Sequence, residues 1–192
     1  MQKSLAVVLS FCVCVSFAAA ENFEGPSKPT FEKGLAAYDA GSYEDAYKIF
    51  SSIEDVDVAA MRNVAFMRRR GQGTKRDPKG AEEMYERAAR AGLPTAQADL
   101  GEMLMNGEAG KPDPARAAVW LALASSAHHP IAEFELAELF ETGTGVQQDL
   151  GQARKLYVDA VARGVPGAKE RLASLDASHP ELSATKRPPD HP

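Results

Sequence analysis

Small and apolar residues recur along this chain every 36 residues. The recurring positions hold alanine, glycine, aspartate and aliphatic side chains in the same order in each row. The columns are Ala60, Ala96, Ala132 and Ala168; Gly71, Gly107 and Gly143; Asp77, Asp113 and Asp149; and Val64, Leu100, Leu136 and Leu172. A fixed period of this length over three rows predicts a repeat protein whose units stack along one axis.

Each row predicts two amphipathic helices joined by a polar loop. Ala96, Leu100 and Met103 have the i, i+4, i+7 spacing that places apolar side chains on one helical face. The glycine column is expected to cap this first helix in a left-handed conformation. Asp77 and Asp113, each followed by proline, are typical of the start of the second helix, because proline lacks the N–H group that would be unpaired there.

The second helices carry alanine stripes interleaved with large apolar residues. Trp120 falls in the large-residue column and is expected to be buried between neighbouring units. A column of small residues on the first helices, Ala65, Gly101 and Ala137, is expected to let each paired helix approach closely.

The repeat pattern occupies most of the chain and leaves both ends outside it. The predicted helical repeat domain, residues 30–175, comprises a short hairpin at 30–53, repeats at 56–91, 92–127 and 128–163, and a capping helix at 166–175. Residues 21–29 form a predicted flexible segment, and the polar, proline-rich residues 176–192 form a predicted disordered tail.

The third row carries the most complete set of motif residues: Ala132, Leu136, Gly143, Gly145, Val146, Asp149, Ala153, Tyr157, Ala160 and Gly164. On these residues the chain resembles the Sel-one-like repeat family, a relative of the tetratricopeptide repeats. The middle row departs from the family pattern at Ala109, Leu121 and His128, which favours altered turns there. The resemblance implies an all-α, right-handed α-solenoid of stacked antiparallel helix pairs that binds proteins or peptides on its superhelical surface.

The first twenty residues have the pattern of a secretory signal peptide. Lys3 precedes an apolar run, and Ala18–Ala20 provide small residues for cleavage before Glu21. The alternative is an uncleaved membrane anchor, for which the run is short of the roughly 20 residues that a span requires. We interpret residues 1–20 as a signal peptide, which predicts a periplasmic or secreted protein.

The cysteine content and the net charge exclude further classes. Both cysteines, Cys12 and Cys14, lie within the predicted signal peptide, so cleavage leaves a chain without a disulfide. Phe11 and Val13 stand where a lipoprotein signal has a small residue, which argues against lipidation. A net charge of −5 at pH 7 argues against a nucleic-acid partner, because phosphate contacts require an excess of Lys and Arg.

No set of residues indicates catalysis, a metal or a cofactor. His128, His129 and Glu133 have a spacing that on one helix suits metal ligands, but Pro130 interrupts them and no further ligand is evident. Ser183 and Lys186 match a Ser-x-x-Lys nucleophile motif without the companion motifs that this chemistry requires. We therefore predict no catalytic residue, no metal ligand and no cofactor.

Charge is unevenly distributed along the repeats. Residues 59–79 hold seven basic and one acidic side chain, including the basic patch Arg68–Lys79, whereas residues 131–149 hold five acidic side chains. One interpretation is ordinary solvated helix faces, and another is a polarised surface that orients a charged partner. Anionic polymer and lipid headgroups are further candidates for the basic patch.

The resemblance places the first helix of each pair on the concave side, which defines candidate groove residues. They lie two positions before, and two and five positions after, the aliphatic core column: Arg62, Phe66, Arg69, Ala98, Glu102, Met105, Phe134, Glu138 and Glu141. Phe66 and Phe134 are the predicted apolar anchors, while the arginine and glutamate side chains orient a partner segment. The alternative is that the large apolar residues pack against a neighbouring helix.

These features predict a non-enzymatic interaction scaffold or adaptor of the cell envelope that docks a protein segment. Regulation of envelope signalling is among the roles that the resemblance implies. Two alternatives stay open from the sequence: an envelope (cell-wall) hydrolase or its accessory factor, and a structural assembly subunit. The sequence leaves the partner, the pathway and the oligomeric state open.

Overall fold

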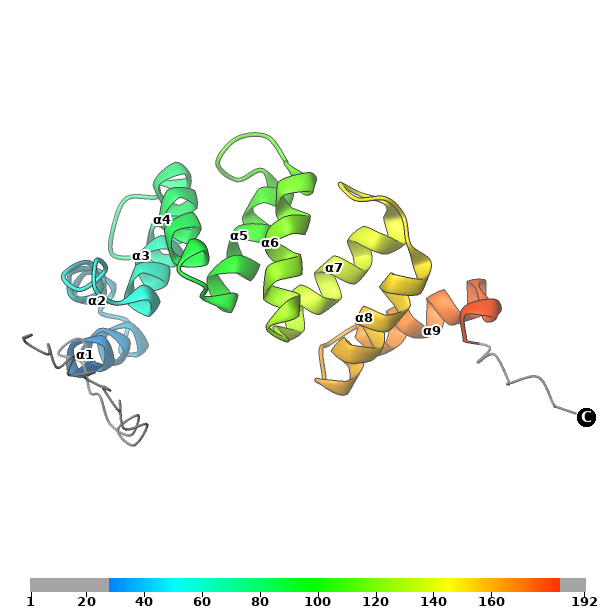
Figure 1. The fold of residues 1–192 in the computed structure, drawn as a ribbon. Coiled ribbons are helices and arrows are strands. Elements are labelled where there is room, and N and C mark those ends of the chain that lie inside the picture. The colour runs from blue at the N-terminus through cyan, green and yellow to red at the C-terminus, as the bar shows by residue number, and fades with distance from the viewer. Residues whose placement is uncertain (1–27, 184–192) are drawn as a thin grey trace, which may run out of the picture.

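The computed structural model describes residues 28–183 as an array of α-helices without strands. The helices are α1 (Lys28–Asp39), α2 (Tyr43–Ser51), α3 (Val58–Arg70), α4 (Pro78–Arg90), α5 (Pro94–Asn106), α6 (Pro114–Ser126), α7 (Pro130–Thr142), α8 (Leu150–Ala162) and α9 (Ala168–Ser178), followed by the 3₁₀ helix η1 (Pro180–Leu182). Each α-helix packs against the ones before and after it, and together they follow a curved row (Figure 1). The predicted all-α solenoid of helical hairpins is confirmed.

The helix boundaries follow from the aspartate and glycine columns. Each second helix of the three 36-residue rows begins after an aspartate whose carboxylate accepts a backbone N–H three residues on, at 2.9–3.1 Å. Each first helix ends at a glycine in the left-handed conformation, with φ of 72°, 63° and 72°. Caps of both kinds satisfy backbone groups that a helix end leaves unpaired.

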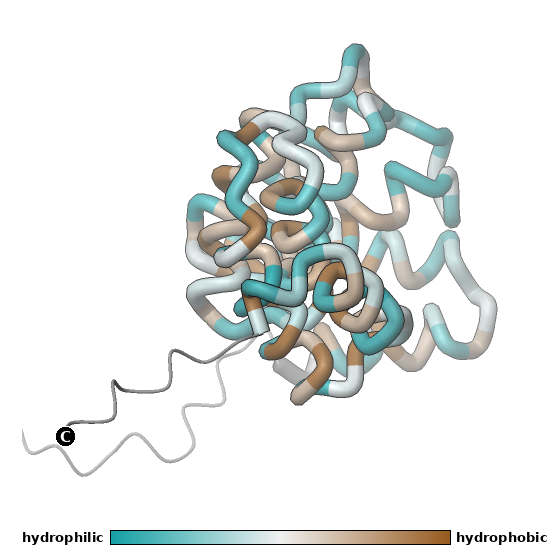
Figure 2. Tube along the Cα trace, turned by 90° about the vertical axis from the view of Figure 1, so that its right-hand side faces the viewer, coloured by the Kyte–Doolittle hydropathy of each residue, from teal (hydrophilic) through white to brown (hydrophobic). Residues whose placement is uncertain are grey.

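The core is a layer between the helices that is divided into four clusters and built largely from alanine, with a few large side chains. In Figure 2, hydrophobic and hydrophilic positions alternate around each helical coil, as expected of amphipathic helices. Tyr85, Leu121 and Tyr157 are fully buried in this layer. A Cβ atom added at Gly101 would lie 2.7 Å from the Leu121 side chain, so the small-residue column does permit close approach of α5 and α6.

Trp120 is half-buried, which corrects the prediction that it lies inside the core. The interior stripe of α6 is formed by Ala117, Leu121 and Ala124, spaced i, i+4 and i+7. Trp120 precedes Leu121 and is turned about 100° away from it around the helix. Its ring therefore packs against the edge of the core cluster while one side contacts solvent.

The predicted disordered tail, residues 176–192, includes residues that the structure shows as helical. Helix α9 continues to Ser178 and is followed by η1. Asp176 accepts two hydrogen bonds from Arg154 of α8, at 2.7 and 3.2 Å, and Leu182 packs against the last core cluster. These contacts order residues 176–183. Residues 28 and 29 of the predicted flexible N-terminal segment begin α1. The predicted signal peptide and the other residues of the predicted flexible ends lie outside the described residues.

Two of the loops between paired helices lie directly on the preceding helix pair. Gly73 lies so close to the backbone of Tyr43, and Gly145 to that of Pro114, that a Cβ atom at either position would overlap backbone atoms. The equivalent position of the middle row is Ala109, whose side chain packs on the core. Because Ala109 carries a Cβ atom, its loop cannot make the same close approach to α4.

Within residues 28–183, no helix is long and apolar enough to cross a membrane.

Candidate functional site

The first helices of the successive pairs (α1, α3, α5, α7 and α9) form one surface, which we call the first-helix face. Charged side chains bridge neighbouring members of this face. Arg62 Nε of α3 donates to Asp99 Oδ2 of α5 at 2.6 Å. Arg171 Nη2 of α9 donates to Glu138 Oε1 of α7 at 2.8 Å. A row of ion pairs therefore runs along this side of the solenoid.

Arg69 is the most highly connected of these cations. Its guanidinium donates to Glu102 at 3.0 Å and makes two hydrogen bonds to Glu108, which lies just after α5. Its side chain is only 13% exposed. The hydrogen bond from Arg69 lowers the pKa of Glu108, since it stabilises the ionised carboxylate. This network joins the carboxyl end of α3 to that of α5.

An apolar hollow of about 320 Å³ lies on the first-helix face between α1 and α3. We call it the Phe66 hollow, and it is lined by Leu35, Tyr38, Asp39, Phe50, Arg62, Asn63, Phe66 and Met67. The guanidinium groups of Arg70 and Arg62 lie 4.6 and 5.7 Å from the centre of the Phe66 ring. Cations at this distance from an aromatic ring are attracted to its π face. The hollow thus combines a mainly apolar and aromatic lining with one guanidinium, that of Arg62, and one carboxylate, that of Asp39.

A second hollow, of about 360 Å³, lies farther along the same face between α5, α7 and α9. We call it the Glu135 hollow, and it is lined by Glu102, Met105, Asn106, Leu121, Glu135, Glu138, Leu139, Thr142, Thr144 and Arg171. Burial, together with the negative charges of Glu102, Glu138 and Asp99, raises the pKa of Glu135 to about 7. This carboxyl group therefore titrates near neutral pH.

The structure places most of the predicted groove residues on the first-helix face. The partly exposed ones are Arg62, Phe66, Arg69, Glu102, Met105, Phe134, Glu138 and Glu141. Ala98 does not belong with them. Ala98 is 6% exposed and packs with Leu121 and Leu136, while the Phe134 ring lies 5.7 Å from that of Tyr157, in the packing between α7 and α8. Phe134 is partly buried in this packing and lines neither hollow, and its anchor role stays a prediction.

Glu135 was missed because the predicted columns omit the position one before the aliphatic core residue. That column, Asn63, Asp99 and Glu135, contributes Asn63 to the Phe66 hollow beside Arg62, and Glu135 to the Glu135 hollow. Each step along a helix turns the side chain by about 100°. The polarity of that column was the signal in the sequence that could have identified it.

The possible metal ligands have structural roles instead. Glu133 is only 1% exposed, and its carboxylate lies 3.0 Å from Arg163 Nε and 3.5 Å from His128 Nδ1. His129 Nδ1 accepts the N–H of Ala132 at 3.4 Å and so caps α7, and burial lowers the pKa of His129. Within residues 28–183, no three His, Cys, Asp or Glu side chains are grouped to hold a metal ion.

Replacing Arg163 by methionine is expected to destabilise the fold by about 1–3 kcal/mol. The change leaves the buried Glu133 carboxylate without its arginine partner, which is costly in a low-dielectric site. Urea unfolding of the variant measures the loss. Arg163→Lys, which keeps the charge, is the matched control and should lose less. Equal midpoints for the wild type and Arg163→Met would show that Glu133 does not depend on this pair.

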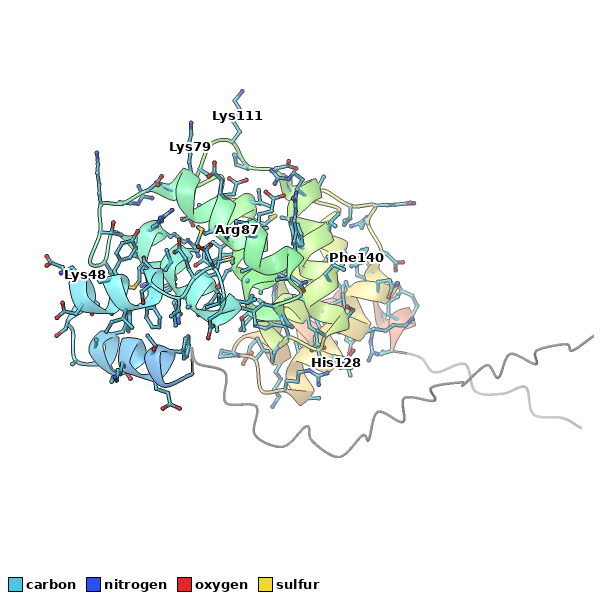
Figure 3. All side chains as sticks on the ribbon, turned by 60° about the vertical axis from the view of Figure 1, so that its left-hand side comes forward. Lys48, Lys79, Arg87, Lys111, His128 and Phe140 are labelled. Atoms are coloured by element: carbon cyan, nitrogen blue, oxygen red, sulfur yellow. The ribbon has the colours of Figure 1, made fainter. Side chains whose placement is uncertain are left out.

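Only part of the basic patch Arg68–Lys79 is available to a ligand. Arg68 donates to the Tyr47 hydroxyl at 3.1 Å, Arg69 is paired with glutamates, and Arg70 lies over Phe66. Lys79 extends into solvent at the edge that carries the long loops, as does Lys111, whereas His128 lies at the opposite edge (Figure 3). The patch is therefore divided between internal contacts and a fringe of exposed lysines.

The repeats of the described helices coincide with a known sequence family. Residues 58–93, 94–129 and 130–165 each match the Sel1 repeat, and together they cover more than half of the chain. The chain belongs to the Sel1 repeat family. Each Sel1 repeat begins at or next to the start of a first helix and contains one helix pair: α3–α4, α5–α6 and α7–α8.

Solved structures of Sel1 repeat proteins are also similar to this chain. The Sel1 repeat protein from Oxalobacter formigenes has 32% identity and a TM-score of 0.71, over 77% of this chain and 61% of that one. The protective antigen c5321 of uropathogenic Escherichia coli, with an SLR fold, has 22% identity and a TM-score of 0.75, over 81% and 34%. The cysteine rich protein B of Helicobacter pylori has 16% identity and a TM-score of 0.50, over 79% and 100%.

This chain thus spans less than two thirds of the length of the first two proteins. Comparison with the curated proteins gives no match. Sel1 repeats generally form non-catalytic scaffolds for protein interactions. The fold therefore indicates protein partners as a class and leaves the particular partner open.

Proposed function

We propose that this Sel1 repeat chain is a non-enzymatic adaptor of the bacterial cell envelope that docks a protein segment along its first-helix face. The observation that carries the proposal is the Phe66 hollow. It is an apolar site of about 320 Å³ on the first-helix face. Apolar hollows of this kind accept the side chains that contribute most of the binding energy of a peptide.

The surroundings of the Phe66 hollow favour an extended segment as the partner. The Glu135 hollow opens on the same face two helix pairs away, and ion pairs run along the face between them. A segment lying along α3, α5 and α7 reaches both hollows. The charges along the face then fix its orientation, since complementary charge contributes mainly to specificity.

The Phe66→Ala variant tests this function. The wild type, Phe66→Ala and the control Leu123→Ala, at an exposed position of α6, are used as baits in extracts of the bacterial envelope. We expect the wild type and Leu123→Ala to retain the same partner protein and Phe66→Ala to lose it, with all three folded by circular dichroism. If folded Phe66→Ala retains the partner as well as the wild type does, the docking site does not lie on this face.

The envelope location is supported by the signal-peptide pattern of residues 1–20. We expect the protein to be exported and to begin near Glu21. N-terminal sequencing of the protein from a periplasmic fraction measures this directly. Recovery of a chain that still begins at Met1 from the cytoplasmic fraction would contradict the envelope role while leaving the docking face intact.

A further inference from the structure

The Glu135 hollow carries more negative charge than its own cations neutralise. Three carboxylates line it, those of Glu102, Glu135 and Glu138, against the single guanidinium of Arg171. Arg171 already donates twice to Glu138 Oε1, at 3.1 and 2.8 Å, and Glu102 accepts from Arg69. Glu135 Oε2 is buried and, among the described residues, has no hydrogen-bond donor.

The walls of the hollow are apolar next to these carboxylates. Met105, Leu121 and Leu139 contribute to the lining, to which Thr142 and Thr144 add hydroxyl groups. Among the described residues, the carboxylates do not form a cluster that could hold a metal ion. A cation carried on an aliphatic stem suits this lining, because the stem packs against the methionine and the leucines while the charge reaches a carboxylate.

The geometry points to a subsite for a basic side chain of the docked segment, with its aliphatic stem against Met105 and Leu139 and its cation at Glu135. This inference rests on the proposed function, since it names what the partner segment presents at a second position of the same face. The chemistry is that of lysine or arginine, because both combine an apolar stem with a charged head.

A basic side chain also removes an unfavourable feature of the free protein. Glu102, Glu138 and Asp99 repel the Glu135 carboxylate, and Arg69 only partly offsets them. A cation placed at Glu135 favours its ionised form, so binding near pH 7 is expected to release a proton. Proton release is a signature that binding through the Phe66 hollow alone does not produce.

The test uses three pools of synthetic octapeptides with blocked termini. The central position is lysine, glutamine or glutamate, and the remaining positions are randomised over uncharged residues. Affinity selection on the purified protein is followed by mass spectrometry, and selected peptides are titrated by calorimetry in two buffers of different ionisation enthalpy. We expect at least tenfold enrichment of the lysine pool, with proton release at pH 7.

The Glu135→Gln variant is expected to lose both the enrichment and the proton release. Glu83→Gln is the matched control, because it removes the same charge from an exposed position of α4. Equal binding of all three pools to the wild type would overturn the basic subsite and leave segment docking in place. Absence of binding by every pool would contradict segment docking as well.

A shortened chain that ends at Ser183 tests whether this chain's own C-terminal residues occupy the Glu135 hollow. The residues that follow include Lys186 and Arg187, which are themselves basic. Unchanged affinity for the lysine pool supports a partner side chain as the occupant. A tenfold gain in affinity on removal of residues 184–192 would assign the hollow to this chain's own terminus and overturn the inference.

Discussion

Leu121→Ala is expected to lower the unfolding free energy by about 2–5 kcal/mol, the range for emptying a fully buried leucine site. Leu121 has no exposed surface, and its side chain fills the space beside Gly101 between α5 and α6. Because Gly101 has no side chain, the position of α5 that faces Leu121 cannot fill the cavity. Urea or thermal unfolding followed by circular dichroism measures the loss.

The neighbouring tryptophan provides the comparison for this result. Trp120→Ala removes a larger side chain, but one that is partly exposed in the folded protein, so a smaller fraction of its apolar surface is buried on folding. We expect its cost to be smaller than that of Leu121→Ala. The reverse order would mean that Trp120 belongs to the interior stripe of α6 and that Leu121 does not.

Glu135→Gln is expected to stabilise the fold at pH 8 and to have little effect at pH 5. The pKa of Glu135 is raised to about 7 in the folded protein, from an ordinary value of 4.5. Between these values the folded state holds a proton that the unfolded state has released, so stability falls as the pH rises from about 4.5 to about 7. Glutamine removes this term, which is worth roughly 1–3 kcal/mol above pH 7.

Unfolding curves of the wild type and Glu135→Gln at several pH values test this prediction. The difference between the two proteins isolates Glu135, because the other titrating groups are common to both. Glu83→Gln, on the outer surface of α4, should track the wild type at every pH. A constant difference between the wild type and Glu135→Gln from pH 5 to pH 8 would contradict a raised pKa at this site.

The helix array could be predicted from the sequence because its signals are local. The glycine and aspartate columns act within a few residues of their own positions, at Gly71 and Asp77 for example, and the same signals occur three times. Because the pattern occurs three times, each repeat supports the helix prediction made for the other two. The extension of α9 was missed because it depends on tertiary contacts, chiefly the pairing of Asp176 with Arg154.

The site was harder to predict because it depends on the angular orientation of each helix. Phe66 lines a hollow on the first-helix face, whereas Phe134 of α7 lines neither hollow and packs against Tyr157. A spacing rule fixes which residues share a side of a helix but not how far that side is rotated toward its neighbours. The charge of Glu135 becomes informative only once Glu102 and Glu138 are seen beside it.

The alanine at position 109 has a mechanical consequence. Where Gly73 and Gly145 press against the preceding helix pair, backbone contacts resist any change of angle between successive units. The junction between α4 and α5 lacks this backbone contact and is held instead by the ion pairs of Arg62 and Arg69 with Asp99, Glu102 and Glu108. Ion pairs weaken as the salt concentration rises, so the angle between the arm that carries the Phe66 hollow and the arm that carries the Glu135 hollow is expected to depend on ionic strength.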